Sequence, residues 1–146
     1  MEQQGVTALL DTPGKAERVD VTPVNGESYE AVVRGHRIVV DQPVEAGGRD
    51  GAPTPVELFV ASLATCVAYY AGRYLARHGY SRDGLAVSAA FTMAGDRPAR
   101  VSDIRLTVRV PASLPAERRP AMQAMVRHCT VHNTVVSTPS ITIDLD

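Results

Sequence analysis

The longest uncharged stretch of the chain, Leu58–Gly72, constrains the fold more than any other feature. It comprises fifteen residues between Glu57 and Arg73. A membrane-spanning helix needs about 20 apolar residues, so a stretch of this length favours a helix that is buried in protein. Two residues mark its start, because Thr54 suits the N-cap and Pro55 suits the first helical position. Glu57 then completes a capping box with Thr54.

The predicted helix continues to about His78, where Gly79 supplies a left-handed stop. One of its faces carries large apolar side chains, and the opposite face carries small ones. The large ones are Phe59, Leu63, Val67, Tyr70 and Tyr74. A helix that is apolar nearly all round has to be surrounded by protein. We therefore expect a central helix that is enclosed by sheets and other helices or covered by a second subunit.

The regions on either side of this helix are rich in predicted strands. Alternating patterns in "RVDVTPV", "SYEAVV" and "HRIVVD" predict strands, the last two joined by a tight turn at Arg34 and Gly35. Residues Leu85–Met93 and Val101–Val110 predict an antiparallel pair. A last strand is expected in "SITIDLD", an edge strand at Val6–Leu10, and a loop in "QPVEAGGRDGAP". This order predicts an α+β fold in a single domain over residues 1–146.

The overall composition excludes several classes of function. With 15 basic and 16 acidic side chains, the net charge of −1 provides no electrostatic surface for nucleic acid or an anionic membrane. The N-terminal residues lack the apolar core of a signal peptide, so we expect a cytoplasmic protein. Two cysteines in a reducing compartment rarely form a static disulfide. If they pair, we expect the pairing to belong to a reaction.

The two cysteines occupy different kinds of sequence. Cys66 lies in the middle of the long apolar helix, where a free cysteine commonly packs as a small hydrophobic side chain. Cys129 follows a predicted helix over about residues 121–128, from which Pro120 is expected to separate a short first turn. Helical spacing places Cys129 on the apolar side at the C-terminal end of that helix.

Three interpretations of the cysteines are compatible with the residues alone. The first is a Cys2His2 zinc site that adds His128 and His132, although the sequence contains no C-x-x-C pair. The second is a hydrolase that pairs a cysteine with a histidine, for which "CTVH" supplies the atoms but no third group is evident. The third is a redox pair, in which one thiolate attacks a substrate and the other forms a disulfide with it.

Electrostatics does not decide which thiol attacks. A position at a helix C-terminus raises the pKa of the Cys129 thiol, whereas its basic neighbours lower that pKa. Cys66 has no nearby cation in the sequence, so any positive group has to come from another segment. The candidates in the N-terminal half are Arg18, Arg34, Arg37 and Arg49.

Two segments of the chain resemble one known family. The string "GGRDGAPTPVELFVASLATC" is followed by "HCTVHNTV", which places Cys129 63 positions after Cys66. Together they resemble the osmotically inducible protein C and organic hydroperoxide resistance family. The resemblance extends from about Tyr29 to the end of the sequence.

The resemblance implies a thiol-dependent peroxidase that needs no metal or other cofactor. Cys66 is then the thiol that attacks an organic hydroperoxide, or hydrogen peroxide, and becomes a sulfenic acid. Cys129 resolves this acid into a disulfide, which a dithiol of the lipoyl type reduces. The family fold is an intertwined homodimer with antiparallel sheets around the central helices, and its active sites lie at the subunit interface.

The sequence departs from the family pattern at two positions. Family members carry a glutamate ten residues before the first cysteine, but this position is Val56 here, and Glu57 is the supporting candidate in its place. Thr130 stands where proline is usual. The missing glutamate motivates an alternative function, which is a non-catalytic homodimer that binds a small apolar or thiol-containing ligand between its subunits.

Overall fold

The computed structural model describes residues 17–146. The chain divides into two compact units, Met1–Thr54 and Pro55–Asp146. The edge strand predicted at Val6–Leu10 lies outside the described residues. A single domain over residues 1–146 stays a prediction, and the two units are described in turn.

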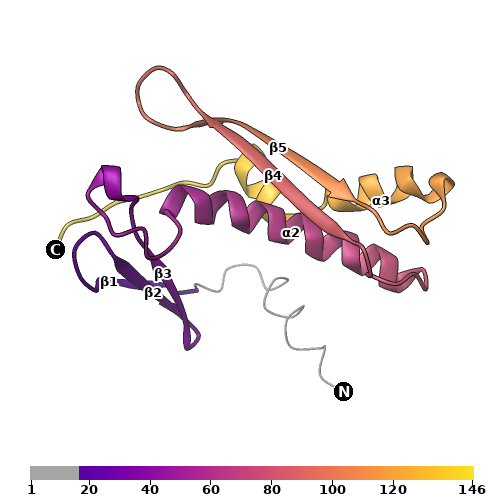
Figure 1. Cartoon of the computed structure of the whole chain (residues 1–146), viewed down its shortest axis with the longest axis horizontal. Coiled ribbons are helices and arrows are strands. Elements are labelled where there is room, and N and C mark those ends of the chain that lie inside the picture. Colours follow the sequence, from indigo (N-terminus) through magenta and orange to yellow (C-terminus); the bar gives the residue numbers. More distant parts are fainter. Residues whose placement is uncertain (1–16) are drawn as a thin grey trace. The chain divides into compact units, whose positions relative to one another are not determined.

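The N-terminal unit contains a three-stranded antiparallel sheet in the order β1-β2-β3. Its strands are β1 (Asp20–Pro23), β2 (Tyr29–Val33) and β3 (His36–Val40) (Figure 1). The predicted hairpin is confirmed, since β2 and β3 pair with Val33 opposite His36. Arg34 and Gly35 both have positive φ, 49° and 81°, as a two-residue hairpin turn of type I′ requires.

A buried carboxylate organises the predicted loop that follows β3. Asp41 accepts backbone hydrogen bonds from Gln42, Arg49 and Gly51 at 2.7, 3.3 and 3.0 Å. The bond from Gly51 is the largest cause that lowers the pKa of the Asp41 carboxyl below its usual value. The loop also contains a short 3-10 turn, η1 (Val44–Ala46). The Gly- and Pro-rich sequence therefore forms an ordered loop around one side chain.

The C-terminal unit is built around one long helix (Figure 1). A two-stranded antiparallel sheet crosses over this helix, and two short helices follow the sheet. The elements are α2 (Pro55–Arg77), β4 (Ala86–Met93), β5 (Val101–Arg109), η2 (Ala116–Arg118), α3 (Arg119–Val126) and α4 (Thr130–Val136). The predicted bounds of the long helix and the predicted antiparallel pair are confirmed, and so is the mixed α+β class.

Two apolar clusters hold this unit together along α2. The C-terminal half of the helix forms one cluster with α3 and the segment before it: Ala71, Tyr74, Leu75, Leu114 and Met122. The middle of the helix contributes the other, which consists of Leu63, Val67 and Cys129 with partly buried neighbours that include Cys66 and Tyr70. We call this second group the thiol cluster.

The other elements of the C-terminal unit leave part of α2 uncovered. Phe59 and Tyr69 are 40% and 44% exposed there. By length and composition α2 is the one described helix that is apolar enough to cross a membrane, a test that core helices of soluble proteins also pass. A helix enclosed on all sides by protein stays a prediction, because a second subunit is one of its possible covers.

Two predictions for the last third of the chain need correction, and one helix there was not predicted. The short first turn is present as η2, but α3 begins at Arg119 and includes Pro120 in its first turn, where the missing N–H costs nothing. Residues after Cys129 form α4, although β-branched residues such as Val131 have low helix propensity. The strand predicted in residues 140–146 is not formed in the described chain. Its Ile143 is 86% exposed, since no neighbouring strand is available to pair with it.

Candidate functional site

The first predicted site residue, Cys66, lies near the middle of α2 and is partly exposed. Regular helix on both sides fixes its backbone. The i, i+3 and i, i+4 spacings place Leu63 and Tyr70 on the same side of the helix as Cys66. All three belong to the thiol cluster. A rigid element thus carries Cys66 at a partly exposed position.

The second predicted site residue, Cys129, is completely buried at the joint between α3 and α4. We call residues 127–129 the joint. Here the sequence-based prediction was wrong, because α3 ends at Val126 and Cys129 is the N-cap of the next helix. Its ψ of 121° interrupts the helical path. The Cys129 thiol therefore lies at the start of α4 and not at the last residue of α3.

The surroundings of Cys129 determine the pKa of its thiol. Its Sγ accepts a hydrogen bond from the backbone N–H of His132 at 3.5 Å. Burial is the main cause that raises the pKa of the Cys129 thiol, and the neighbouring Cys66 side chain raises it further. The bond from His132 lowers the pKa but is a smaller effect. Cys129 is therefore held mainly as a neutral thiol at neutral pH.

The structure brings the two predicted thiols together. They share one apolar cluster, and the side chain of Cys66 is close enough to interact directly with the Cys129 thiol. Both are free cysteines, so the structure represents the reduced dithiol. Two adjacent thiols, one accessible and one buried, allow attack on a substrate by the first and disulfide formation by the second.

Neither the zinc site nor the cysteine–histidine hydrolase gains support from this geometry. Among residues 17–146, no group of three or more His, Cys, Asp or Glu side chains is arranged to hold a metal ion. His132 contacts the Cys129 sulfur through its backbone N–H, which leaves no role for its ring in that contact. His128 is exposed at the joint.

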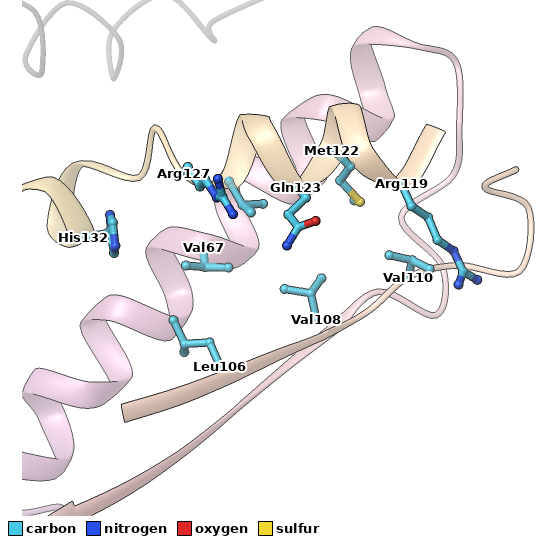
Figure 2. A pocket seen from close by; sticks show the side chains of 10 residues that line it. Val67, Leu106, Val108, Val110, Arg119, Met122, Gln123, Arg127 and His132 are labelled. Carbon is cyan, nitrogen blue, oxygen red and sulfur yellow. The ribbon is translucent and has the colours of Figure 1, made fainter. Parts of the chain in front are cut away.

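A groove of about 520 Å³ lies beside the thiol cluster (Figure 2). It runs between α3 and β5, with Val67 of α2 at one end. Its lining is largely apolar, with cationic and polar side chains from α3 and α4: Val67, Leu106, Val108, Val110, Arg119, Met122, Gln123, Val126, Arg127 and His132. Val67 and Val126 also pack in the thiol cluster. Two side chains that line the groove therefore also pack around Cys129.

The supporting candidate Glu57 is not placed next to the thiols. It lies in the first turn of α2, nine residues before Cys66. The rise of a helix separates the two residues by about 14 Å along the axis. Direct action of this carboxylate on the Cys66 sulfur is therefore excluded by distance.

The four candidate arginines all belong to the N-terminal unit. Arg18 forms an ion pair with Asp20 at 2.8 Å, and Arg37 forms one with Glu30. Both pairs are local to the three-stranded sheet. The approach of an arginine to Cys66 stays a prediction.

Sequence reasoning missed one feature of this site. The hydroxyl groups of Tyr70 and Thr130 lie 3.2 Å apart and form a hydrogen bond between α2 and α4. The spacing of Tyr70 predicts only packing, and Thr130 is notable in the sequence only because proline is usual there. The sequence did contain a signal for this bond, since Thr130 directly follows Cys129 and Tyr70 lies one helical turn after Cys66.

The profile of the OsmC-like protein family matches residues 47–144, and the chain belongs to this family. No curated protein matches the sequence significantly.

Solved structures show the same fold. A Psychrobacter arcticus protein described as an osmotic stress induced and detoxification response protein has a TM-score of 0.73 at 22% identity, over 85% of this chain and 90% of that one. An OsmC-like protein from Mycoplasma pneumoniae has a TM-score of 0.72 at 15% identity, over 86% and 90%. A Vibrio cholerae protein described as an organic hydroperoxide resistance protein has a TM-score of 0.64 at 17% identity, over 86% and 89%. That structure holds captopril in one of its active sites.

Proposed function

We propose that this protein is a thiol-dependent peroxidase that reduces organic hydroperoxides. The observation that carries the proposal is the pair of adjacent free thiols, of which Cys66 is accessible and Cys129 is buried. Membership of the OsmC-like family supports a redox role for such a pair. The organic hydroperoxide resistance described for the Vibrio cholerae relative agrees with it.

The reaction takes place in three steps. The Cys66 thiolate attacks the terminal peroxide oxygen, the O–O bond breaks, and the alkoxide leaves and takes up a proton. The Cys129 thiolate then attacks the sulfur of the Cys66 sulfenic acid, so that an S–S bond forms, the S–O bond breaks, and hydroxide leaves and takes up a proton to become water. A dithiol reductant of the lipoyl type finally reduces the disulfide and becomes oxidised itself. No metal or organic cofactor enters any of these steps.

The groove favours an organic substrate over hydrogen peroxide. Its apolar lining gains free energy from covering a hydrocarbon group, at roughly 25 cal/mol for each Å² removed from water. Hydrogen peroxide has no such group. Because Val67 and Val126 line the groove and also pack beside Cys129, a substrate body bound there lies close to the thiol pair.

We also propose that two copies form a homodimer in the cytoplasm. The uncovered side of α2 exposes Phe59 and Tyr69, and the C-terminal residues expose Ile141, Ile143 and Leu145 at alternating positions. Alternation of this kind suits a strand that pairs with a second chain. Sedimentation is expected to give a dimer that Phe59→Glu dissociates, and a monomeric wild type contradicts the dimer.

Peroxide consumption with a dithiol reductant tests the enzymatic proposal. We expect turnover with cumene hydroperoxide to exceed that with hydrogen peroxide, and Cys66→Ser to abolish both. Mass spectrometry of the wild-type protein after one equivalent of peroxide is expected to detect the Cys66–Cys129 disulfide. Turnover at the wild-type rate in Cys66→Ser refutes the mechanism.

A non-catalytic ligand-binding homodimer is the second candidate. Two observations favour it: Val56 replaces the glutamate usual in the family, and captopril, a small thiol-containing molecule, occupies an active site of the Vibrio cholerae relative. The pH dependence of Cys66 alkylation separates the two functions. An apparent pKa at or above the free-thiol value of about 8.5, without peroxide turnover, favours the binding protein.

A further inference from the structure

The hydrogen bond between Tyr70 and Thr130 joins the immediate surroundings of the two cysteines. Tyr70 follows Cys66 by one helical turn on α2, and Thr130 follows Cys129 directly as the first residue of α4. Their hydroxyl oxygens are 3.2 Å apart. The bond therefore ties the start of α4, and with it Cys129, to the part of α2 that carries Cys66.

Backbone hydrogen bonds attach the joint to α3 and α4 but not to α2. Within the joint, the N–H of His128 bonds to Met125 and the N–H of Cys129 bonds to Val126, at 3.1 and 3.2 Å. These bonds shape the turn after α3 but do not reach α2. Apolar packing in the thiol cluster resists separation of the elements, but the hydrophobic effect behind it is not directional. The hydrogen bond between Tyr70 and Thr130 is directional, so it restricts how α4 can shift along α2.

Disulfide closure depends strongly on such positioning. The two sulfur atoms have to come to about 2.05 Å with a dihedral angle near 90°, and deviations store strain. If Cys129 moves away, the sulfenic acid on Cys66 stays exposed to a second peroxide molecule. The sulfenate then attacks that peroxide, gains one oxygen as sulfinic acid and releases an alcohol, a step that is irreversible for most proteins.

We propose that Tyr70 and Thr130 are positioning residues that hold Cys129 against Cys66 and so direct the sulfenic acid toward the disulfide. This inference rests on the proposed peroxidase function. The two residues act through the placement of Cys129. Loss of one neutral hydrogen bond changes the population of the docked joint by about three- to tenfold.

Four variants isolate the bond. Tyr70→Phe and Thr130→Val each remove one hydroxyl and keep the shape of the side chain. Thr130→Ser keeps the hydroxyl and is the rescue variant. Tyr69→Phe is the matched control, because Tyr69 packs edge-on against Tyr70 and its hydroxyl is bonded instead to Arg73.

Rapid-mixing measurements with cumene hydroperoxide separate formation of the sulfenic acid from closure of the disulfide. We expect Tyr70→Phe and Thr130→Val to slow closure three- to tenfold and to raise the sulfinic acid yield in proportion, with the first step unchanged. The double variant is expected to match the single ones, since both remove the same bond. Thr130→Ser and Tyr69→Phe are expected to behave like the wild type. Unchanged closure in both hydroxyl deletions overturns the inference.

Equilibration with a glutathione buffer tests the positioning without peroxide. The deletions are expected to shift the Cys66–Cys129 pair three- to tenfold toward the reduced dithiol, because the two thiols are then less often in contact. An unchanged equilibrium in a variant with native circular dichroism contradicts the inference. If the wild type forms no sulfenic acid with peroxide, the peroxidase proposal fails, and this equilibrium still decides whether the bond positions Cys129.

Discussion

The two cysteines of this protein stand on two different kinds of backbone. Cys66 belongs to α2, an uninterrupted helix of 23 residues that both apolar clusters of the C-terminal unit share. Cys129 ends a joint between helices of eight and seven residues, where the chain leaves the helical path. The accessible thiol is thus on the rigid element, and the buried thiol is on the irregular one.

This difference suits a division of labour between the thiols. A thiol that attacks external peroxide needs access and a fixed environment. A thiol that resolves the product needs protection from peroxide and enough freedom to close the short distance to its partner.

Replacement of the buried thiol is expected to change the product without preventing the first reaction. In Cys129→Ser, one equivalent of peroxide is still reduced within about threefold of the wild-type rate, because Cys66 keeps its access. Disulfide is then absent, and excess peroxide converts Cys66 to sulfinic acid. Mass spectrometry and stopped-flow fluorescence measure the two outcomes. Loss of the first step in this variant contradicts the assignment of Cys66 as the attacking thiol.

Disulfide closure is expected to accelerate as the pH rises. The thiolate of Cys129 is the attacking form, and burial raises its pKa, so only a small fraction is ionised at neutral pH. The rate of closure increases about tenfold for each pH unit until the pH reaches that pKa. Closure is measured from about pH 6 to pH 9 after a single equivalent of peroxide. A rate that is constant over this range shows that the Cys129 thiol is not held protonated.

The two sides of the thiol cluster are expected to differ in their contribution to stability. Leu63→Ala on α2 removes a buried side chain and lowers the free energy of unfolding by about 2–5 kcal/mol. Val131→Ala on α4 removes less apolar volume from a partly buried site and costs about 1 kcal/mol. Urea unfolding of the reduced protein measures both. Equal costs indicate that α4 is held as firmly as α2.

The smallest effect is expected at the first turn of α2. Glu57→Gln keeps the shape of the side chain and removes its charge about 14 Å from Cys66 along the helix axis. We expect peroxide turnover to change by less than about threefold, because screening and distance weaken the interaction. A loss of tenfold or more indicates that Glu57 acts through another charged residue, such as one of the four candidate arginines.

Much of the secondary structure was predictable because its signals are local. Helix start and stop residues gave the bounds of α2, and period-two alternation gave β4 and β5. Arg34 and Gly35 marked the hairpin in the N-terminal sheet. Predictions failed where local propensity competes with context. Five of the seven residues of α4 are β-branched and disfavour a helix, and the alternating residues 140–146 find no partner strand in the described chain.

The sequence by itself determined which chemistry is available: two thiols, no dinucleotide or phosphate loop, and an apolar helix that places Cys66 among core residues. Only the tertiary structure decided that Cys129 is buried beside Cys66, that it caps α4, and that Tyr70 bonds to Thr130. The contacts of Cys129 with Cys66 and of Tyr70 with Thr130 join residues about 60 positions apart in the chain. Such contacts depend on how α2, α3 and α4 pack together, which no short stretch of sequence encodes.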